Sequence, residues 1–75
     1  MFAIARFTVP LADAAHFEAH LNTALDAFSQ CAGFKSGEFG QNLDEPTLWS
    51  LTTNWENVGS YRRALSNNDV KMNAI

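Results

Sequence analysis

Residues 48–55 alternate between two kinds of side chain. One set, at every second position, is mostly aromatic or aliphatic: Trp49, Leu51, Thr53 and Trp55. The set between them is mostly polar: Leu48, Ser50, Thr52 and Asn54. A period of two is typical of a strand whose two faces meet different surroundings. We therefore expect a strand here with one buried aromatic face and one polar face.

The period changes directly after this predicted strand. Val58, Tyr61 and Leu65 recur at helical spacing, and Asn57 stands where it can cap the new helix. A strand is thus expected to become a helix within a few residues. The junction gathers three side chains that could do chemistry: Trp55, Tyr61 and Arg62.

Residues 2–9 alternate in the same way and predict a first strand, which Pro10 ends because proline cannot donate to a sheet ladder. Ala3 and Ala5 leave room over one face of this strand. That space could be filled by a large neighbour such as a tryptophan, which we favour, or by a ligand.

An amphipathic helix is predicted next, with Asp13 as its cap and its end near Gln30. Its apolar stripe has helical spacing and is flanked by Leu25 and Cys31; it consists of Phe17, Leu21, Ala24 and Phe28. His16 and His20 stand one turn apart. Two histidines without a clear third ligand make a poor zinc site, so we expect a solvated pair and no metal.

Gly33 is placed to end this helix with a positive φ. A weak second strand follows over residues 34–43, with Phe34, Ser36 and Glu38 expected on one face. Its internal glycines favour a bulge or the close approach of another backbone. Residues 43–47 predict a tight turn into the strand of residues 48–55. After the second helix, Asp69 is expected to cap a last turn through residues 70–72.

The order strand, helix, strand, strand, helix indicates an α+β fold, a ferredoxin-like antiparallel sheet with two helices on one face. That pattern normally has a fourth strand, and no candidate for it remains before Ile75. We expect either that the chain is truncated at its C-terminus or that another chain completes the sheet. An open apolar edge would otherwise favour aggregation.

Chain length predicts one domain, residues 1–75, that needs outside support. A chain of 75 residues buries only about 60% of its unfolded surface. The single cysteine, Cys31, excludes an internal disulfide and is expected to be a small buried residue. With 47% hydrophobic and 17% charged residues, the composition favours association between subunits. We expect a homodimer that joins the polar sheet face of Ser50, Thr52 and Asn54 to its equivalent, together with apolar contacts from the first strand.

Charge and hydropathy exclude two classes of partner. The net charge is −3 and the five basic residues are scattered, so no nucleic-acid surface is expected. No apolar run is long enough to span a membrane, and the first residues lack the order of a secretory signal. A cytoplasmic protein is the resulting expectation.

The chain resembles the antibiotic biosynthesis monooxygenase family, whose members are ferredoxin-like proteins that pair as dimeric α+β barrels. The likeness runs through almost the whole sequence. Its most specific block is TNWENVGSYRRALS at residues 53–66, supported by IARFTVP at 4–10, AGF at 32–34 and LDEPTLW at 43–49. Typical members continue into a fourth strand, which this sequence does not contain.

The resemblance implies a cofactor-independent monooxygenase that oxidises a small aromatic phenol or quinol with O₂, without metal or flavin. The family's Trp and Tyr pair matches Trp55 and Tyr61 in type and spacing. Tyr61 would hold or relay the phenolic proton, Trp55 would donate its Nε1 hydrogen to a developing oxyanion, and Arg6 or Arg62 could favour the anion. The residues expected to bind the substrate are Arg6, Phe7, Trp49, Leu51 and Arg62.

Two other functions are known or conceivable for this fold. A related branch of the superfamily degrades haem with an axial histidine near the end of the second helix. Residues 69–75 contain no histidine, so we do not expect haem degradation. The main alternative is a non-enzymatic dimer of the same fold that binds a small apolar molecule. A closed aromatic cavity holding Trp55 and Tyr61 would favour the enzyme, and a solid core would favour the alternative.

Overall fold

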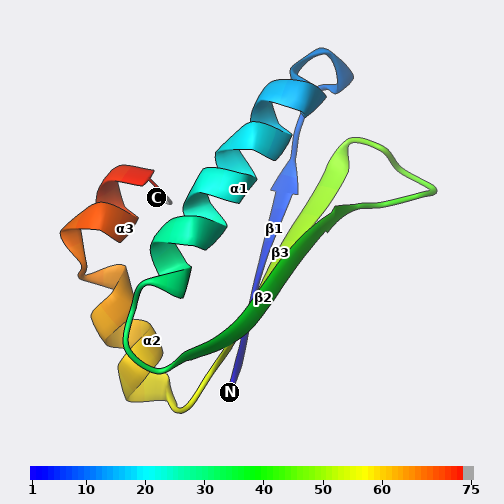
Figure 1. Cartoon of the computed structure of the whole chain (residues 1–75). Coiled ribbons are helices and arrows are strands. Elements are labelled where there is room, and N and C mark those ends of the chain that lie inside the picture. The colour runs from blue at the N-terminus through cyan, green and yellow to red at the C-terminus, as the bar shows by residue number, and fades with distance from the viewer. Residues whose placement is uncertain (74–75) are drawn as a thin grey trace.

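Strand β3 (Leu48–Trp55) is the centre of a three-stranded antiparallel sheet with the order β1-β3-β2. The computed structural model describes residues 1–73 (Figure 1). The other elements, in chain order, are β1 (Phe2–Thr8), a 3-10 turn (Leu11–Asp13), α1 (Ala14–Ser29), β2 (Phe34–Gln41), α2 (Val58–Leu65) and α3 (Asn68–Asn73). The predicted βαββα order and α+β class are confirmed, and the last turn expected over residues 70–72 forms part of a short third helix.

The two faces of the sheet differ as the alternation in β3 predicts. All four residues of the aromatic set are buried: Trp49, Leu51, Thr53 and Trp55. On the opposite face, Phe2 and Ile4 of β1 lie beside Asn54 and Thr52 and are 70% and 61% exposed. The inner face therefore carries the core, and the outer face combines polar side chains with two exposed apolar ones.

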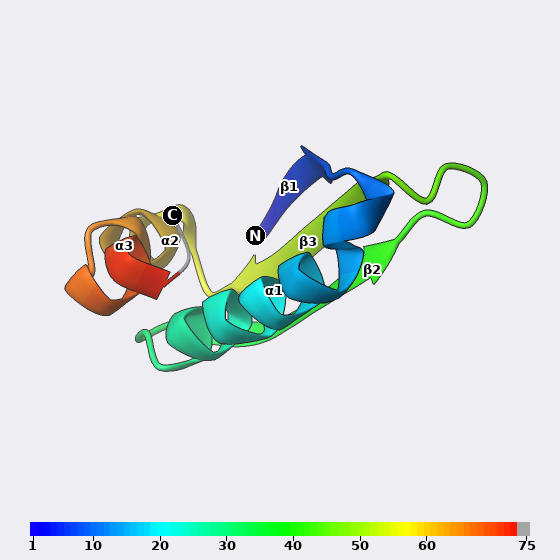
Figure 2. The same cartoon turned by 90° about the horizontal axis from the view of Figure 1, so that it is seen from above.

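Helix α1 covers the inner face on the side of β2 and β3, while α2 and α3 stack together beyond the end of β3 (Figure 2). The predicted apolar stripe of α1 is largely confirmed, because Leu21, Ala24 and Phe28 are buried. Asp13 does occupy the cap position of α1, but its side chain makes no capping hydrogen bond. The preceding 3-10 turn already bonds the Asp13 N–H to the Pro10 carbonyl (2.9 Å).

The connection from α1 to β2 turns at Gly33, whose φ of 86° confirms the predicted left-handed residue. The pairing of β2 with β3 shifts register between Phe34 and Ser36, which is the predicted bulge placed a few residues earlier. The shift puts Phe34 against Trp55 (ring centroids 5.3 Å). The expectation that Phe34 shares a face with Ser36 and Glu38 is therefore wrong, because a bulge reverses the alternation.

The cap of α2 is as predicted: the Asn57 side chain accepts a hydrogen bond from the Ser60 N–H (2.9 Å). The buried stripe of this helix differs from the prediction, since Val58 is 49% exposed while Ser60 is 2% exposed. Helix α3 is capped by Asn67, whose Oδ1 accepts from the Asp69 N–H (2.8 Å). Asp69 therefore lies in the first turn and is not the cap.

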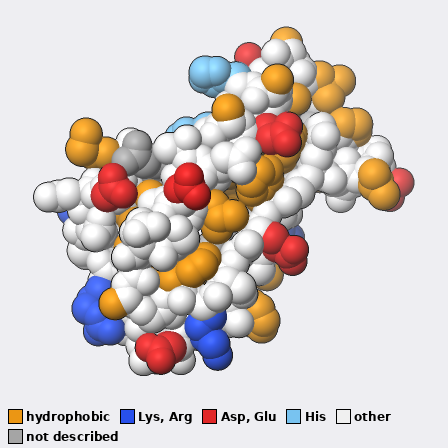
Figure 3. All heavy atoms as spheres, in the orientation of Figure 1, with side chains coloured by type: hydrophobic (Ala, Val, Ile, Leu, Met, Phe, Trp, Pro, Cys, Tyr) orange, Lys and Arg blue, Asp and Glu red, His pale blue; other side chains and the backbone are white. Residues whose placement is uncertain are grey.

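The surface of the molecule is mixed in character. Seen from the side of Figure 1, hydrophobic side chains show along the seam between α1 and the sheet, and histidines project from the upper part of α1 (Figure 3). Among the described residues, none of the helices is both long and apolar enough to cross a bilayer.

Candidate active site

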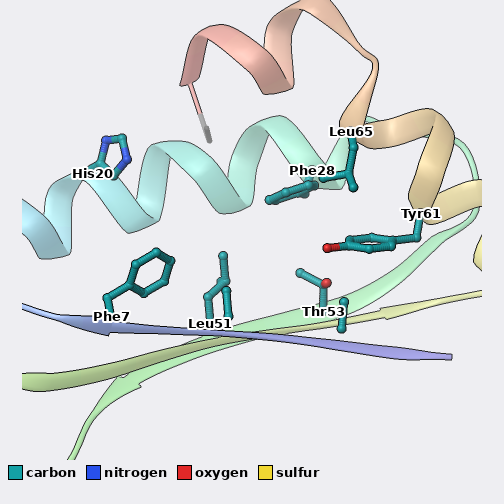
Figure 4. Close-up of a pocket in the computed structure, with 9 residues that line it drawn as sticks. Phe7, His20, Phe28, Leu51, Thr53, Tyr61 and Leu65 are labelled. Carbon is teal, nitrogen blue, oxygen red and sulfur yellow. The ribbon is translucent and has the colours of Figure 1, made fainter.

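A cavity of about 440 Å³ lies between the inner face of β1 and the helices. Its size falls within the range of small-molecule sites. Ala5 on its wall is itself exposed, so the cavity opens to solvent along β1. The side chains around it come from β1, α1, β3 and α2, as Figure 4 shows in close-up, and are Ala3, Ala5, Phe7, His20, Phe28, Leu51, Thr53, Tyr61 and Leu65.

Tyr61 enters this cavity from α2. The Asn57 cap fixes the start of the helix, and Tyr61 follows one turn later, half-buried against the Trp55 ring (centroids 5.7 Å). Its hydroxyl points from α2 into the cavity, above Thr53 (Figure 4). No hydrogen bond joins this hydroxyl to another described residue, so it remains available to a ligand as donor or acceptor.

Trp55 stands behind Tyr61 and not on the cavity wall. Its side chain is completely buried and meets the rings of Phe28 and Phe34 edge to face, at centroid distances of 5.9 and 5.3 Å. The indole Nε1–H donates to the Thr53 hydroxyl oxygen (2.8 Å). Trp55 is therefore engaged within the protein.

Thr53 connects Trp55 to the cavity. Its Oγ1 accepts the indole hydrogen while its side chain lines the cavity beneath Tyr61. Because a hydroxyl that accepts one hydrogen bond still has its own proton to donate, Thr53 can offer that proton to a ligand oxygen. The cavity thus has two neighbouring hydroxyl groups at one end, on Tyr61 and on Thr53.

The structure brings some of the expected substrate-binding residues together and places others elsewhere. Phe7 and Leu51 line the cavity with Tyr61. Trp49 does not line it, since its ring packs under Phe17 (centroids 5.7 Å). Arg6 and Arg62 are both exposed and neither lines the cavity. A cation therefore does not reach this space from either predicted arginine.

Several cavity residues were not among the predicted site residues. Phe28 and Leu65 were assigned to the apolar faces of their helices, and position alone does not tell a core contact from a cavity wall. The expectation that a tryptophan fills the room over Ala3 and Ala5 is wrong, because a cavity lies over them and neither tryptophan lines it. The remaining two are His20, assigned to solvent, and Thr53.

No cluster of three or more potential metal ligands occurs among the described residues. Cys31, the single cysteine, is half-buried and its Sγ lies 3.6 Å from the Ala27 carbonyl oxygen. Burial, and to a smaller extent the Asp69 carboxylate, raise the pKa of the Cys31 thiol. A raised pKa disfavours the thiolate and so argues against a nucleophilic role.

Comparisons with known proteins agree with this architecture. The antibiotic biosynthesis monooxygenase family model matches residues 1–72. No curated protein matches the sequence.

Several solved structures share the fold. SnoaB, a cofactor-independent oxygenase from Streptomyces nogalater, is 26% identical with a TM-score of 0.86, and the match covers 97% of this chain and 72% of SnoaB. A conserved protein from Methanosarcina mazei is 15% identical with a TM-score of 0.86, covering 96% and 71%. The protein PA3566 from Pseudomonas aeruginosa is 17% identical with a TM-score of 0.79, covering 95% and 72%.

The resemblance inferred from the sequence is thereby confirmed. Since the family match extends over nearly every residue and the solved structures share the fold, the chain belongs to the antibiotic biosynthesis monooxygenase family.

Proposed function

We propose that this protein is a cofactor-independent monooxygenase that oxidises a small aromatic phenol or quinol with O₂. The observation that carries the proposal is the Tyr61 hydroxyl, which projects into an apolar cavity and makes no hydrogen bond to another residue within 1–73. The similarity to SnoaB, a cofactor-independent oxygenase, supports the reaction class. In this reaction the substrate itself supplies the electron that reduces O₂. The protein binds the substrate, orients it and controls its proton.

The first step in this mechanism is loss of the phenolic proton. Phe28 and Leu51 hold the aromatic rings, and the Tyr61 hydroxyl accepts a hydrogen bond from the substrate hydroxyl and relays its proton to water at the open side of the cavity. The phenolate is a much stronger reductant than the phenol and passes an electron to O₂. The resulting phenoxyl radical and superoxide combine to a peroxide anion. This anion takes up a proton to give a hydroperoxide, which loses water to leave a carbonyl. For a ring CH₂ group the balance is CH₂ + O₂ → C=O + H₂O.

Thr53 and Trp55 stabilise the negative charge together in this mechanism. The Thr53 hydroxyl oxygen accepts a hydrogen bond from the Trp55 N–H. The Thr53 hydroxyl hydrogen is left to donate to the substrate oxyanion. We therefore assign Trp55 a positioning role that acts through Thr53. Direct donation from Trp55 to the substrate would first require its bond to Thr53 to break.

Replacing Tyr61 by phenylalanine is expected to slow O₂ consumption by roughly 10²-fold, which is the scale of a lost proton-transfer group. The substitution removes the hydroxyl and keeps the ring that packs on Trp55, so stability should change little. The measurement is O₂ uptake with a panel of quinols, using an oxygen electrode.

Val58→Ala serves as the control, because Val58 is exposed on the same helix and does not line the cavity. Its rate should equal that of the wild type. Equal rates for Tyr61→Phe and the wild type would remove Tyr61 from the mechanism. An absence of turnover with every quinol would favour the alternative, a non-enzymatic dimer that binds a small apolar molecule.

We also propose that two chains pair through the outer face of the sheet. Phe2 and Ile4 are exposed there beside Asn54 and Thr52, so pairing would cover apolar surface that is costly in water. Ile4→Glu should break this dimer by placing a carboxylate in the interface. Light scattering should then give one chain of 8.3 kDa, against twice that mass for the wild type.

Val58→Glu is the matched control for the dimer, because it adds the same charge to α2 and away from the sheet. It should leave the mass at two chains. A wild-type mass of one chain would contradict the proposal outright.

A further inference from the structure

The cavity has a third polar side chain, which the proposed mechanism does not use. His20 of α1 lies at its rim, far from the Tyr61 hydroxyl (Figure 4). Eight residues separate His20 from Phe28 on this helix, which at 1.5 Å per residue is about 12 Å. A second hydrogen-bonding position is therefore present at the other end of the cavity.

The pairing of β1 with β3 locates the two ends of the cavity without reference to α1. Ala3 pairs with Thr53, so this end of β1 lies beside the two hydroxyl groups. At the other end, the Phe7 ring contacts Phe17 (centroids 5.2 Å), and Phe17 in turn lies 6.1 Å from the His20 ring. The cavity therefore extends along β1 from the hydroxyl groups to the imidazole.

The walls between these ends are apolar. They are formed by Ala5, Phe28, Leu51 and Leu65. The described lining contains no Lys, Arg, Asp or Glu. A carboxylate or phosphate on a ligand would be buried there without a cation to pair with it, which is costly. Neutral aromatic ligands with oxygen atoms at both ends match this distribution of polar groups.

We propose that His20 is a specificity-determining residue that hydrogen-bonds the far oxygen of a neutral polycyclic phenol whose first hydroxyl is held at Tyr61. This inference rests on the proposed function and deepens it by defining the ligand class. A neutral imidazole carries one donor and one acceptor nitrogen, so it can bind either a hydroxyl or a carbonyl oxygen. A single-ring phenol held at Tyr61 is too short to reach it.

The charged and titratable groups around His20 do not supply the hydrogen bond to the far oxygen of the ligand. Asp13 and His16 share a shallow depression with it at the start of α1. Among the described residues that line the cavity, Tyr61 is the only other titratable side chain. Helix α3 carries Asp69 and Lys71, and neither lines the cavity.

The test compares two neutral ligands that differ only at the far end, 2-naphthol and 2,6-dihydroxynaphthalene. Binding is measured without O₂ by quenching of tryptophan fluorescence, so no turnover is needed. His20→Leu should weaken binding of the dihydroxy ligand by roughly three- to tenfold, the scale of one net hydrogen bond. It should change binding of 2-naphthol by less than about twofold on the same scale.

Two further variants distinguish the loss of a hydrogen bond at His20 from a general change in the cavity lining. His20→Asn keeps a donor and an acceptor and should restore part of the affinity for the dihydroxy ligand. His16→Leu makes the same change one turn away, outside the cavity lining, and should affect neither ligand. If His20→Leu lowers the affinity for both ligands equally, or for neither, the assignment is overturned.

The outcome for His20 is separable from the outcome for the proposed function. If the wild type binds both naphthols but consumes no O₂ with any quinol, the monooxygenase proposal fails and the role of His20 is judged from the binding data alone. If the wild type binds neither naphthol, the ligand class and the role of His20 fail together, whatever the O₂ uptake.

Discussion

Replacing Gly33 by alanine is expected to lower the free energy of unfolding by roughly 3 kcal/mol, from the left-handed backbone and from overpacking together. Gly33 has a φ of 86°, which a Cβ disfavours, and an added Cβ would collide with the Ser60 side chain at the start of α2. Ser60 is buried and cannot move aside freely. Thermal denaturation should show a loss of about 12 to 24 °C for a domain of this size.

Gly40→Ala is the matched control for this substitution. It adds the same methyl group in β2, where φ is not positive and no atom lies within 4 Å of the new Cβ. Its midpoint should stay close to that of the wild type. If both variants unfold at the wild-type midpoint, the turn at Gly33 is not constrained as the structure indicates.

The Gly33 turn also positions the candidate site. Its carbonyl accepts a hydrogen bond from the Glu56 N–H (2.8 Å), which ties the end of α1 to the junction between β3 and α2. Helix α2 starts at that junction and carries Tyr61 into the cavity. A displacement of α2 by a larger residue at Gly33 would therefore move the Tyr61 hydroxyl as well.

The sequence predicted the central strand well, because its signal is strong and local. Alternation over eight residues, with two tryptophans on one side, leaves one choice for the buried face of β3. The cap at Asn57 and the left-handed Gly33 were equally predictable. Each depends on one residue type whose conformational preference is specific.

Predictions from weaker patterns were wrong where tertiary contacts determine which residues are buried. In β2 the bulge reverses the alternation, so Phe34 packs inward against Trp55. In α2 the close approach of Gly33 buries Ser60, while Val58, the more apolar residue, faces solvent. Local sequence does not contain these long-range contacts.

The structure brings only some of the predicted site residues together in one cavity. Tyr61, Phe7 and Leu51 do line one cavity, but both arginines lie outside it. The resemblance supplied residue types and spacing, and a spacing does not say which way an exposed strand or helix residue points. His20 is exposed, as expected, and it also lies at the rim of a cavity whose other walls come from β1, β3 and α2.

Ala5→Phe is expected to abolish most ligand binding while leaving the protein folded. Ala5 lies on the inner face of β1 opposite Leu51, and both line the cavity. A benzyl group there would occupy the space of the ligand's rings, and an overlap costing about 1 to 3 kcal/mol lowers affinity roughly ten- to hundredfold. Phenylalanine is favoured in strands and Ala5 is exposed, so the fold should tolerate it.

The matched control is Ala19→Phe, which adds the same group to an exposed position of α1 that does not line the cavity. Fluorescence titration with 2-naphthol should give wild-type affinity for this control and a large loss for Ala5→Phe. Circular dichroism should show both variants folded. Wild-type affinity in folded Ala5→Phe would mean that the ligand binds elsewhere. The effects expected for Tyr61→Phe and His20→Leu would then lose their common site, because both depend on a ligand lying along β1 between these two side chains.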